Sequence, residues 1–580
     1  MAHSLLKSGS RLSLLTLGSR ILGLLREMTK AAFLGTTQLS DAFTVAFFIP
    51  NLLRRLFAEN SISVAFIPTF RRYLDTESRE KTAEFLSATF TFLTFAVSLT
   101  VVAGILAAPV IVPLFGTGTP ETLLLTRIMF PYLALISVAA LFQGILNGVR
   151  VFSPSGFTPI LFNLTIIGCT WLLADRAGNP ARAMAIGVLA GGTIQMAFQI
   201  PFVVARGFRF SLVPLVTAIR NPGTRKVLRL IGPTVIGMAA YQINDLISSI
   251  LASNAGRGIV SSLQYSLRLQ ELILGIFAVS IGTVILPDLS AHAAKEAWDA
   301  FNNLLSRAMN TIALITIPVT LFFLVSGESL IILLFKTRSF SDESVSLTLQ
   351  AFVWHIPGLY FIAANRILAP AFYARSDTRS PTLAGILSFV VNITLALALV
   401  GPLRGGGIAL ALSAASAVNT VLLVAFLGRS RLLAVSSLVR TSAGYAVKMI
   451  IFSLIAAAPI YLIRTPLYQF FAGSNRLYSQ GIPLMISLVI FGGMGMTLLL
   501  VTRDQLLIQV VNLVRSRGDT SFSWYPNREK KPITENNAAA ASTNRRPPLS
   551  GSRPRTPFTN TVNNGNRSPA TITPVFTMRV

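Results

Sequence analysis

Charged residues, cysteine and histidine are all scarce in this sequence. Only 12% of its 580 residues are charged, whereas soluble globular domains carry about 25%. The single cysteine, Cys169, excludes an intramolecular disulfide framework and a thiolate metal site. The three histidines, His3, His292 and His355, are scattered and predict no metal cluster. The sequence also lacks a P-loop, an H-E-x-x-H helix and a nucleophile elbow. We therefore expect neither an enzyme nor a resident metal or cofactor.

Apolar residues dominate instead. They make up 52% of the chain, and the mean hydropathy is +0.65. A helix needs about 20 apolar residues to cross a bilayer. On this basis the sequence predicts an all-α polytopic membrane protein with about 14 transmembrane helices, whose cores are residues 12–34, 42–70, 85–113, 123–149, 157–173, 183–204, 228–252, 261–289, 304–325, 345–372, 383–400, 408–427, 444–463 and 482–501.

The distribution of positive charge predicts the orientation. The net charge is +27, but most basic residues lie in alternate short loops between the predicted spans, as the positive-inside rule requires of cytoplasmic loops. Both termini should then be cytoplasmic, and nucleic acid is not an expected partner. Residues 515–580 are rich in Pro, Asn, Ser, Thr and Arg. We expect them to form a disordered basic tail that contacts at most anionic membrane lipids.

A repeated segment suggests two lobes. Residues 61–68 (SISVAFIP) resemble residues 280–287 (SIGTVILP). The fourth and tenth spans also share an early proline, Pro131 and Pro357. Repeats in the same direction suggest lobes related by an axis along the membrane normal, with the substrate path between them. We therefore expect two six-helix lobes around a central cavity, residues 1–206 and 207–428, followed by two further helices in residues 429–514.

Arginine inside apolar spans is the main indication of function. A mid-bilayer arginine costs about 2.5 to 3.5 kcal/mol on translocon scales, so it persists where it faces a cavity or a counter-charge. In the first span a polar stripe recurs every three or four residues and predicts one helix face, formed by Ser13, Thr16, Arg20, Gly23, Glu27 and Lys30. The eighth span carries Ser261, Arg268 and Glu271. Guanidinium groups bind phosphate through paired hydrogen bonds, so we expect a cavity for a phosphate or diphosphate.

Two simpler interpretations of these arginines remain open. Arg268 and Glu271 are three residues apart and could neutralise each other. Arg54 and Arg55 diverge by about 100° on a helix, so one of them could extend towards the membrane interface instead of the cavity.

Three strings resemble those of the MurJ (MviN) family of lipid II flippases, within the MOP superfamily of exporters. They are residues 19–27 (SRILGLLRE), residues 41–43 (DAF) with 49–59 (IPNLLRRLFAE), and residues 282–287 (GTVILP). The resemblance implies alternating access by a protein of the bacterial inner membrane. Its substrate would be lipid II, the undecaprenyl-diphosphate-linked disaccharide pentapeptide, moved outwards for peptidoglycan synthesis. The protein would act as a monomer, with cell-wall synthesis proteins as potential contacts.

The resemblance also implies roles for individual residues. Arg20, Arg26 and Arg268 would hold the diphosphate, and Arg54 would belong to the same set. Ser261 and Glu271 fall on cavity positions, and Asp41 would act at the periplasmic gate. Two departures from the family pattern are Leu267, where an acidic residue is common, and Glu27 in place of Asp.

The sequence also bears on which driving force is coupled to transport. Some family members bind sodium, for which Asp245 and Asn392 would be remnants, but Ala396 stands where a second carboxylate is expected. We therefore expect the membrane potential, or a proton, and not sodium to drive the cycle.

Three other classes of protein compete with this interpretation. An exporter of O-antigen lipids would handle the same diphosphate, whereas an exporter of cationic drugs would need carboxylates in its cavity. A membrane glycosyltransferase or phosphatase should show clustered acidic or histidine residues near a membrane face. A scaffolding protein would have no need of buried arginine.

Overall fold

The computed structural model describes residues 2–55, 65–116, 118–429, 433–473 and 475–508. The chain divides into a unit of residues Met1–Thr520 and a second unit, Ser521–Val580. The predicted tail, residues 515–580, lies outside the described residues, and so does half of the repeated segment at 61–68, namely residues 61–64. Every regular element in the described residues is helical, which confirms the predicted all-α class.

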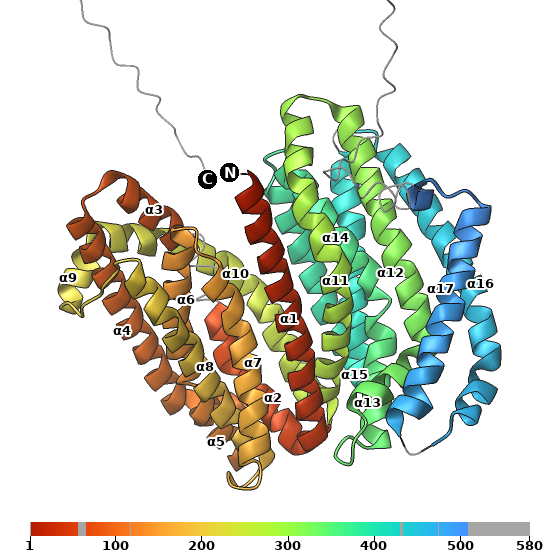
Figure 1. Cartoon of the computed structure of the whole chain (residues 1–580), viewed down its shortest axis with the longest axis horizontal. Helices are drawn as coiled ribbons and strands as arrows, with labels where there is room; N and C mark the ends of the chain where they lie inside the picture. The colour runs from red at the N-terminus through yellow and green to blue at the C-terminus, as the bar shows by residue number, and fades with distance from the viewer. Residues whose placement is uncertain (1, 56–64, 117, 430–432, 474, 509–580) are drawn as a thin grey trace, which may run out of the picture. The chain divides into compact units, whose positions relative to one another are not determined.

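The helices follow one another with short connections (Figure 1). The first group comprises α1 (Ala2–Leu34), α2 (Gln38–Arg54), α3 (Ile67–Thr76), α4 (Arg79–Ile111), the 3₁₀ turn η3 (Val112–Phe115), α5 (Pro120–Met129), α6 (Tyr132–Gly148), α7 (Ser153–Leu173), α8 (Pro180–Ala205) and α9 (Leu215–Arg220). The second comprises α10 (Pro222–Asn254), α11 (Ile259–Ala294), α12 (Trp298–Phe335), α13 (Asp342–His355), α14 (Gly358–Tyr373), α15 (Arg379–Gly428), α16 (Val435–Phe470), the π turn η4 (Leu477–Gly481) and α17 (Ile482–Val501).

Several of these helices are long and apolar enough to cross a membrane. Eight in the described residues meet that condition, or nine if the bent pair α13 and α14 is one span. The 50-residue α15 merges two predicted spans across a kink at Arg404, where φ is 46°. The predicted number of 14 transmembrane helices stays a prediction.

Proline breaks two helices at corresponding places. Pro131 separates α5 from α6, and Pro357 separates α13 from α14, which are bent by 44°. Proline has no backbone N–H and its ring clashes with the preceding turn, so a helix that reaches it bends or restarts. These matching breaks are what two related lobes would contain, but the predicted domain boundaries stay a prediction.

Helix packing falls mainly within two groups. In the first, α7 packs against α8 and α1, and α6 packs against α8. Gly191 allows the close approach of α7 and α8, because a Cβ there would lie 2.7 Å from the ring of Phe162. In the second, α14 packs against α15, while α16 and α17 pack together on α12 (Figure 1). Contacts of α1 and α2 with α11 join the groups. The candidate site lies at this junction.

Asp504, in the segment after α17, forms hydrogen bonds with residues of α16. It accepts hydrogen bonds from Lys448 Nζ at 2.7 Å, from the Tyr445 hydroxyl at 3.2 Å and from the backbone N–H groups of Leu506 and Leu507. Burial raises the pKa of this carboxyl, but the hydrogen bonds, led by that of Lys448, outweigh burial and lower the pKa below its ordinary value of 3.8. The ionised form is therefore the one that stabilises the fold.

We expect this stabilisation to depend on pH. Because the folded-state pKa is depressed, the contribution is complete above the ordinary pKa and is lost as the pH falls through the folded-state value. Thermal unfolding in detergent should show Asp504→Asn less stable than wild type at pH 7, with the difference shrinking as the pH falls below about 4. Asp299→Asn, at an exposed position on α12, serves as the control. A difference that stays constant down to low pH would contradict this assignment.

Candidate functional site

The polar stripe of α1 turns towards neighbouring helices. Glu27 and Lys30 are buried, with 4% and 3% of their surfaces exposed. Arg20 lies about two turns before Glu27 on the same face, since seven residues make about two turns. In Figure 1, α1 runs between α7 and α11, and it contacts both. The part of the predicted stripe that holds Glu27 and Lys30 therefore faces protein, whereas Thr16, nearer the start of α1, is exposed.

Glu27 stands at the centre of a group that we call the arginine cluster, formed by Arg26, Glu27, Arg268 and Glu271. Its Oε1 accepts a hydrogen bond from Arg26 Nη2 at 2.8 Å and lies 3.7 Å from Arg268 Nε. Arg26 also donates to Asn163 of α7 through Nη1 at 3.1 Å. One carboxylate thus links an arginine of α1 to an arginine of α11.

Arg268 is shared between two carboxylates. Its Nη1 donates to Glu271 Oε2 at 2.7 Å, so the pair that the spacing allowed does form. With Glu27 as a second acidic neighbour, Arg268 has two carboxylate partners although Leu267 precedes it. Among the described residues, Arg268 Nε and Glu27 Oε2 are nevertheless buried without a hydrogen-bond partner. The cluster therefore keeps unused hydrogen-bonding capacity.

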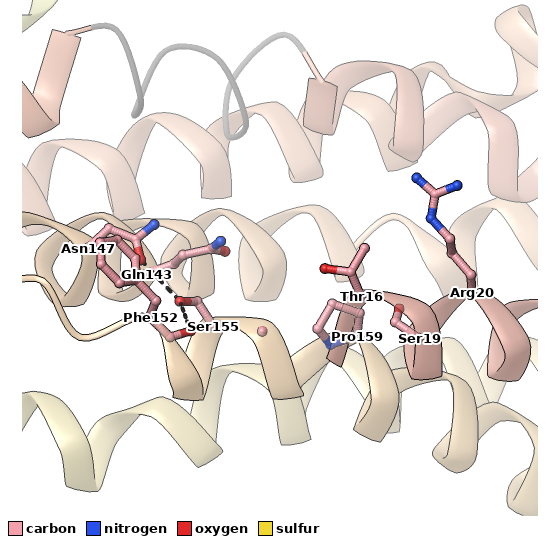
Figure 2. A pocket seen from close by; sticks show the side chains of 9 residues that line it. Thr16, Ser19, Arg20, Gln143, Asn147, Phe152, Ser155 and Pro159 are labelled. Atoms are coloured by element: carbon pink, nitrogen blue, oxygen red, sulfur yellow. Dashed lines mark hydrogen bonds between the residues drawn. The ribbon is translucent and has the colours of Figure 1, made fainter. Parts of the chain in front are cut away.

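Arg20 differs from the other predicted arginines. It has no hydrogen-bond or ion-pair partner in the part of the chain that the structure describes. It lines a cavity of about 430 Å³, whose other lining residues are Thr16, Ser19, Gln143, Asn147, Phe152, Ser155, Gly156 and Pro159. Figure 2 shows Arg20 at one end of this lining and Asn147 at the other. This guanidinium is available for a ligand.

The charges around Glu27 are unequal. Three cations, Arg26, Lys30 and Arg268, lie near Glu27 and outnumber the two carboxylates, Glu27 and Glu271. Lys30 Nζ donates to Thr44 Oγ1 at 2.7 Å and lies 4.8 Å from the centre of the Tyr265 ring, so it gains no carboxylate partner from these contacts. The arrangement can therefore attract an anion.

Asp41 makes a separate contact between α2 and the beginning of α11, which we call the gate contact. Its carboxylate accepts hydrogen bonds from Gly258 N at 2.6 Å, Ser261 N at 2.9 Å and Ser261 Oγ at 2.7 Å. Gly258 has a φ of 79°, and a Cβ there would lie 2.5 Å from the carbonyl oxygen of Thr36, so only glycine fits. Ser261 is fully buried. It therefore lies with Asp41 and not with the arginine cluster.

Further hydrogen bonds surround the gate contact. The Tyr265 hydroxyl donates to the Gly35 carbonyl at 3.0 Å, and the hydroxyls of Thr36 and Ser344 are 2.8 Å apart. All of these contacts lie near the C-terminal end of α1. The two groups of helices are thus tied together on that side.

Arg54 and Arg55 take different partners. Arg54 Nε donates to Asn51 Oδ1 at 2.8 Å, one turn earlier on α2. Arg55 pairs with Asp245 of α10 at 2.8 Å. The described contacts do not join Arg54 to the arginine cluster, so its predicted role stays a prediction.

The suggested sodium remnants have protein partners. Asp245 pairs with Arg55, and Asn392 Nδ2 donates to Asn244 Oδ1 at 2.7 Å. Within the described ranges, no group of three His, Cys, Asp or Glu residues could hold a metal ion.

Sequence reasoning missed the amide side chains near the arginines. Asn163 contacts Arg26, and Gln143 and Asn147 line the cavity beside Arg20. These amides carry the same signal as the arginines, because each is a polar side chain within an apolar span.

Comparison with known proteins identifies relatives of this chain. Residues 30–480 match the family model described as lipid II flippase MurJ. A probable lipid II flippase MurJ from Treponema pallidum (strain Nichols) is 48% identical over 518 residues, which cover 88% of this chain and 98% of the relative.

Two solved structures share the fold. One is of a lipid II flippase MurJ in an inward closed conformation, with a TM-score of 0.70, 24% identity and coverage of 85% of this chain and 99% of that one. The other is an inward-facing multidrug resistance MATE family transporter of the MOP superfamily, with a TM-score of 0.57, 16% identity and coverage of 74% and 96%. The fold is thus common to transporters of different substrates, but the family model and the 48% identity are specific, and the chain belongs to the lipid II flippase MurJ family.

Proposed function

We propose that this protein carries lipid II from the cytoplasmic to the periplasmic leaflet of the bacterial inner membrane. The observation that carries the proposal is the guanidinium of Arg20, which has no partner among the described residues. It lies on the same helix as a cluster in which Glu27 holds arginines from α1 and α11. A diphosphate offers the oxygen acceptors that guanidinium groups bind in pairs. Family membership supports lipid II as the molecule that bears this diphosphate.

In this mechanism Glu27 holds two arginines of the cluster in position. Without substrate, the like charges of Arg26 and Arg268 would repel each other, and the carboxylate keeps them in place. When a diphosphate arrives, Arg20, which has no partner among the described residues, supplies donors for its oxygens, and Arg268 exchanges a carboxylate for them. Binding therefore engages Arg20 directly and requires a rearrangement of the cluster at Arg268.

Alternating access follows from the position of the gate contact. With a cytoplasmic N-terminus, the C-terminal end of α1 and the Asp41 contact lie on the periplasmic side. Arg20 lies about 20 Å along α1 from Leu34, at 1.5 Å per residue. This conformation is then closed to the periplasm, and substrate reaches Arg20 from the cytoplasmic side. Breaking the gate contact opens the opposite side.

The membrane potential can supply the driving force. Moving one charge through the full field is worth about 2.3 kcal/mol per 100 mV. With an inside-negative membrane, the lipid anion moves outwards downhill, and the empty cationic site is drawn back towards the cytoplasm. The transport cycle then needs neither ATP nor a catalytic step. One chain, with lobes at residues 1–206 and 207–428, is sufficient to form the transport path. A cavity whose described lining contains Arg20 and no carboxylate does not suit cationic drugs.

Complementation tests the proposal in cells. After depletion of the native flippase, Arg20→Ala, Arg26→Ala and Arg268→Ala should each fail to restore lipid II on the outer membrane face. Loss of one charged hydrogen-bond donor costs about 1.5 to 3 kcal/mol, or roughly tenfold to a hundredfold in binding. Arg338→Ala, in the exposed connection between α12 and α13, should complement normally. If all three cavity variants reach wild-type expression and export, the proposed site is wrong.

A further inference from the structure

The cavity beside Arg20 has an uncharged end that the diphosphate does not explain. Its volume of about 430 Å³ falls within the range of about 300 to 1,000 Å³ for small-molecule sites. Gln143 and Asn147 of α6 and Phe152, just before α7, lie at the end away from Arg20 (Figure 2). Pro159 and Phe152 both line the cavity and are separated by about 10 Å at helical rise. There is room for a group attached to the phosphate.

The amides at this end have unused hydrogen-bonding groups. Gln143 is exposed and makes no hydrogen bond within the described residues. Asn147 accepts from the Ser155 hydroxyl at 3.1 Å through Oδ1, and its NH₂ group has no partner in the same part of the chain. An unsatisfied amide in a membrane-crossing helix is costly, so these groups must meet water or a ligand. Each amide can both donate and accept.

Phe152 adds an apolar surface to this end. It is 40% exposed and lines the cavity together with the two amides. A sugar ring presents hydroxyl groups that donate and accept at its edge and C–H groups on its faces. Amide side chains match the edge, and an aromatic ring matches a face. A peptide bearing charged side chains would instead need charged partners, and among the described residues that line the cavity Arg20 alone is charged.

We propose that Gln143, Asn147 and Phe152 form a subsite for the sugar attached to the lipid diphosphate, with the diphosphate at Arg20. This inference rests on the proposed function and extends it. The protein would then recognise its substrate by the glycan as well as by the charge, and the amide residues would determine specificity. Lipids with a bare diphosphate would bind only at the Arg20 end.

Binding measurements on the full-length protein in detergent test this subsite. The probes are polyprenyl diphosphate, the same lipid bearing the disaccharide without peptide, and complete lipid II. The Gln143→Leu/Asn147→Leu double variant should bind both sugar-bearing lipids at least tenfold more weakly and polyprenyl diphosphate as wild type does. Arg20→Ala should weaken all three. Gln195→Leu, which removes an amide of α8 outside the cavity lining, should leave all three unchanged.

The results of these binding measurements distinguish failure of the sugar subsite from failure of the proposed function. Unchanged binding of the polyprenyl diphosphate also shows that the double variant is folded. If the double variant binds both sugar-bearing lipids as wild type does, or loses all three lipids equally, the subsite is wrong while the flippase proposal stands. If only complete lipid II is weakened, the amides contact peptide and not sugar, which overturns the assignment. If the wild-type protein binds none of the lipids, the proposed function itself fails.

Discussion

Replacement of Asp41 by alanine is expected to open the periplasmic side of the protein and to lower lipid II transport at least tenfold. The Asp41 carboxylate accepts three hydrogen bonds from the beginning of α11, two of them from backbone N–H groups. Each donor left buried without a partner costs about 1 to 3 kcal/mol. The closed conformation therefore loses enough stability to shift the equilibrium towards the opposite one.

Disulfide cross-linking can follow this shift. The hydroxyls of Thr36 and Ser344 of α13 are 2.8 Å apart on the same side of the molecule as the gate contact, so cysteines at both positions should cross-link in a Cys169→Ala background. The cross-link should form readily with Asp41 present and much more slowly in Asp41→Ala. Asp299→Ala, on the exposed start of α12, is the control and should not change the rate. Equal rates with and without Asp41 would show that the carboxylate does not hold this side closed.

The second large effect is expected for Glu27→Gln. The carboxylate of Glu27 is buried and lies between Arg26 and Arg268. Removing one partner of a buried ion pair costs about 3 to 5 kcal/mol, because it leaves an uncompensated charge. Here the loss leaves two arginines and Lys30 close to one another. Reversible unfolding in mixed detergent micelles should therefore show a free energy of unfolding lower by about that amount.

Glu271→Gln is the matched control for this prediction. Glu271 also pairs with Arg268, but its side chain is 58% exposed. Exposed ion pairs contribute about 0 to 1 kcal/mol, so this variant should unfold nearly as wild type does. If the two substitutions destabilise the protein equally, Glu27 is not the residue that holds the cluster together.

The sequence predicted the features that depend on spacing along one helix. The common face of Glu27 and Lys30 on α1 and the Arg268–Glu271 pair follow from helical periodicity and are present in the structure. Family membership also followed from short strings of residues and is confirmed. These features need no knowledge of how the helices pack.

Contacts between helices could not be predicted from the sequence. Ser261 could not be assigned to Asp41 from sequence, because the two residues meet only when α2 packs against α11. Glu27 could not be recognised as the neighbour of Arg268 for the same reason. The sequence does show an unusual polar residue in a span, but only the packing decides which partner it finds.

The most direct test of the central claim is translocation of lipid II by the purified protein in proteoliposomes without ATP. We predict that wild-type protein moves lipid II across the bilayer, faster when an imposed potential favours movement of the anion. Arg20→Ala and Arg268→Ala should be at least tenfold slower, while Arg338→Ala keeps the wild-type rate. Translocation that requires ATP and ignores the potential, or that proceeds at the wild-type rate in both cavity variants, would contradict a carrier built around arginines that bind the diphosphate.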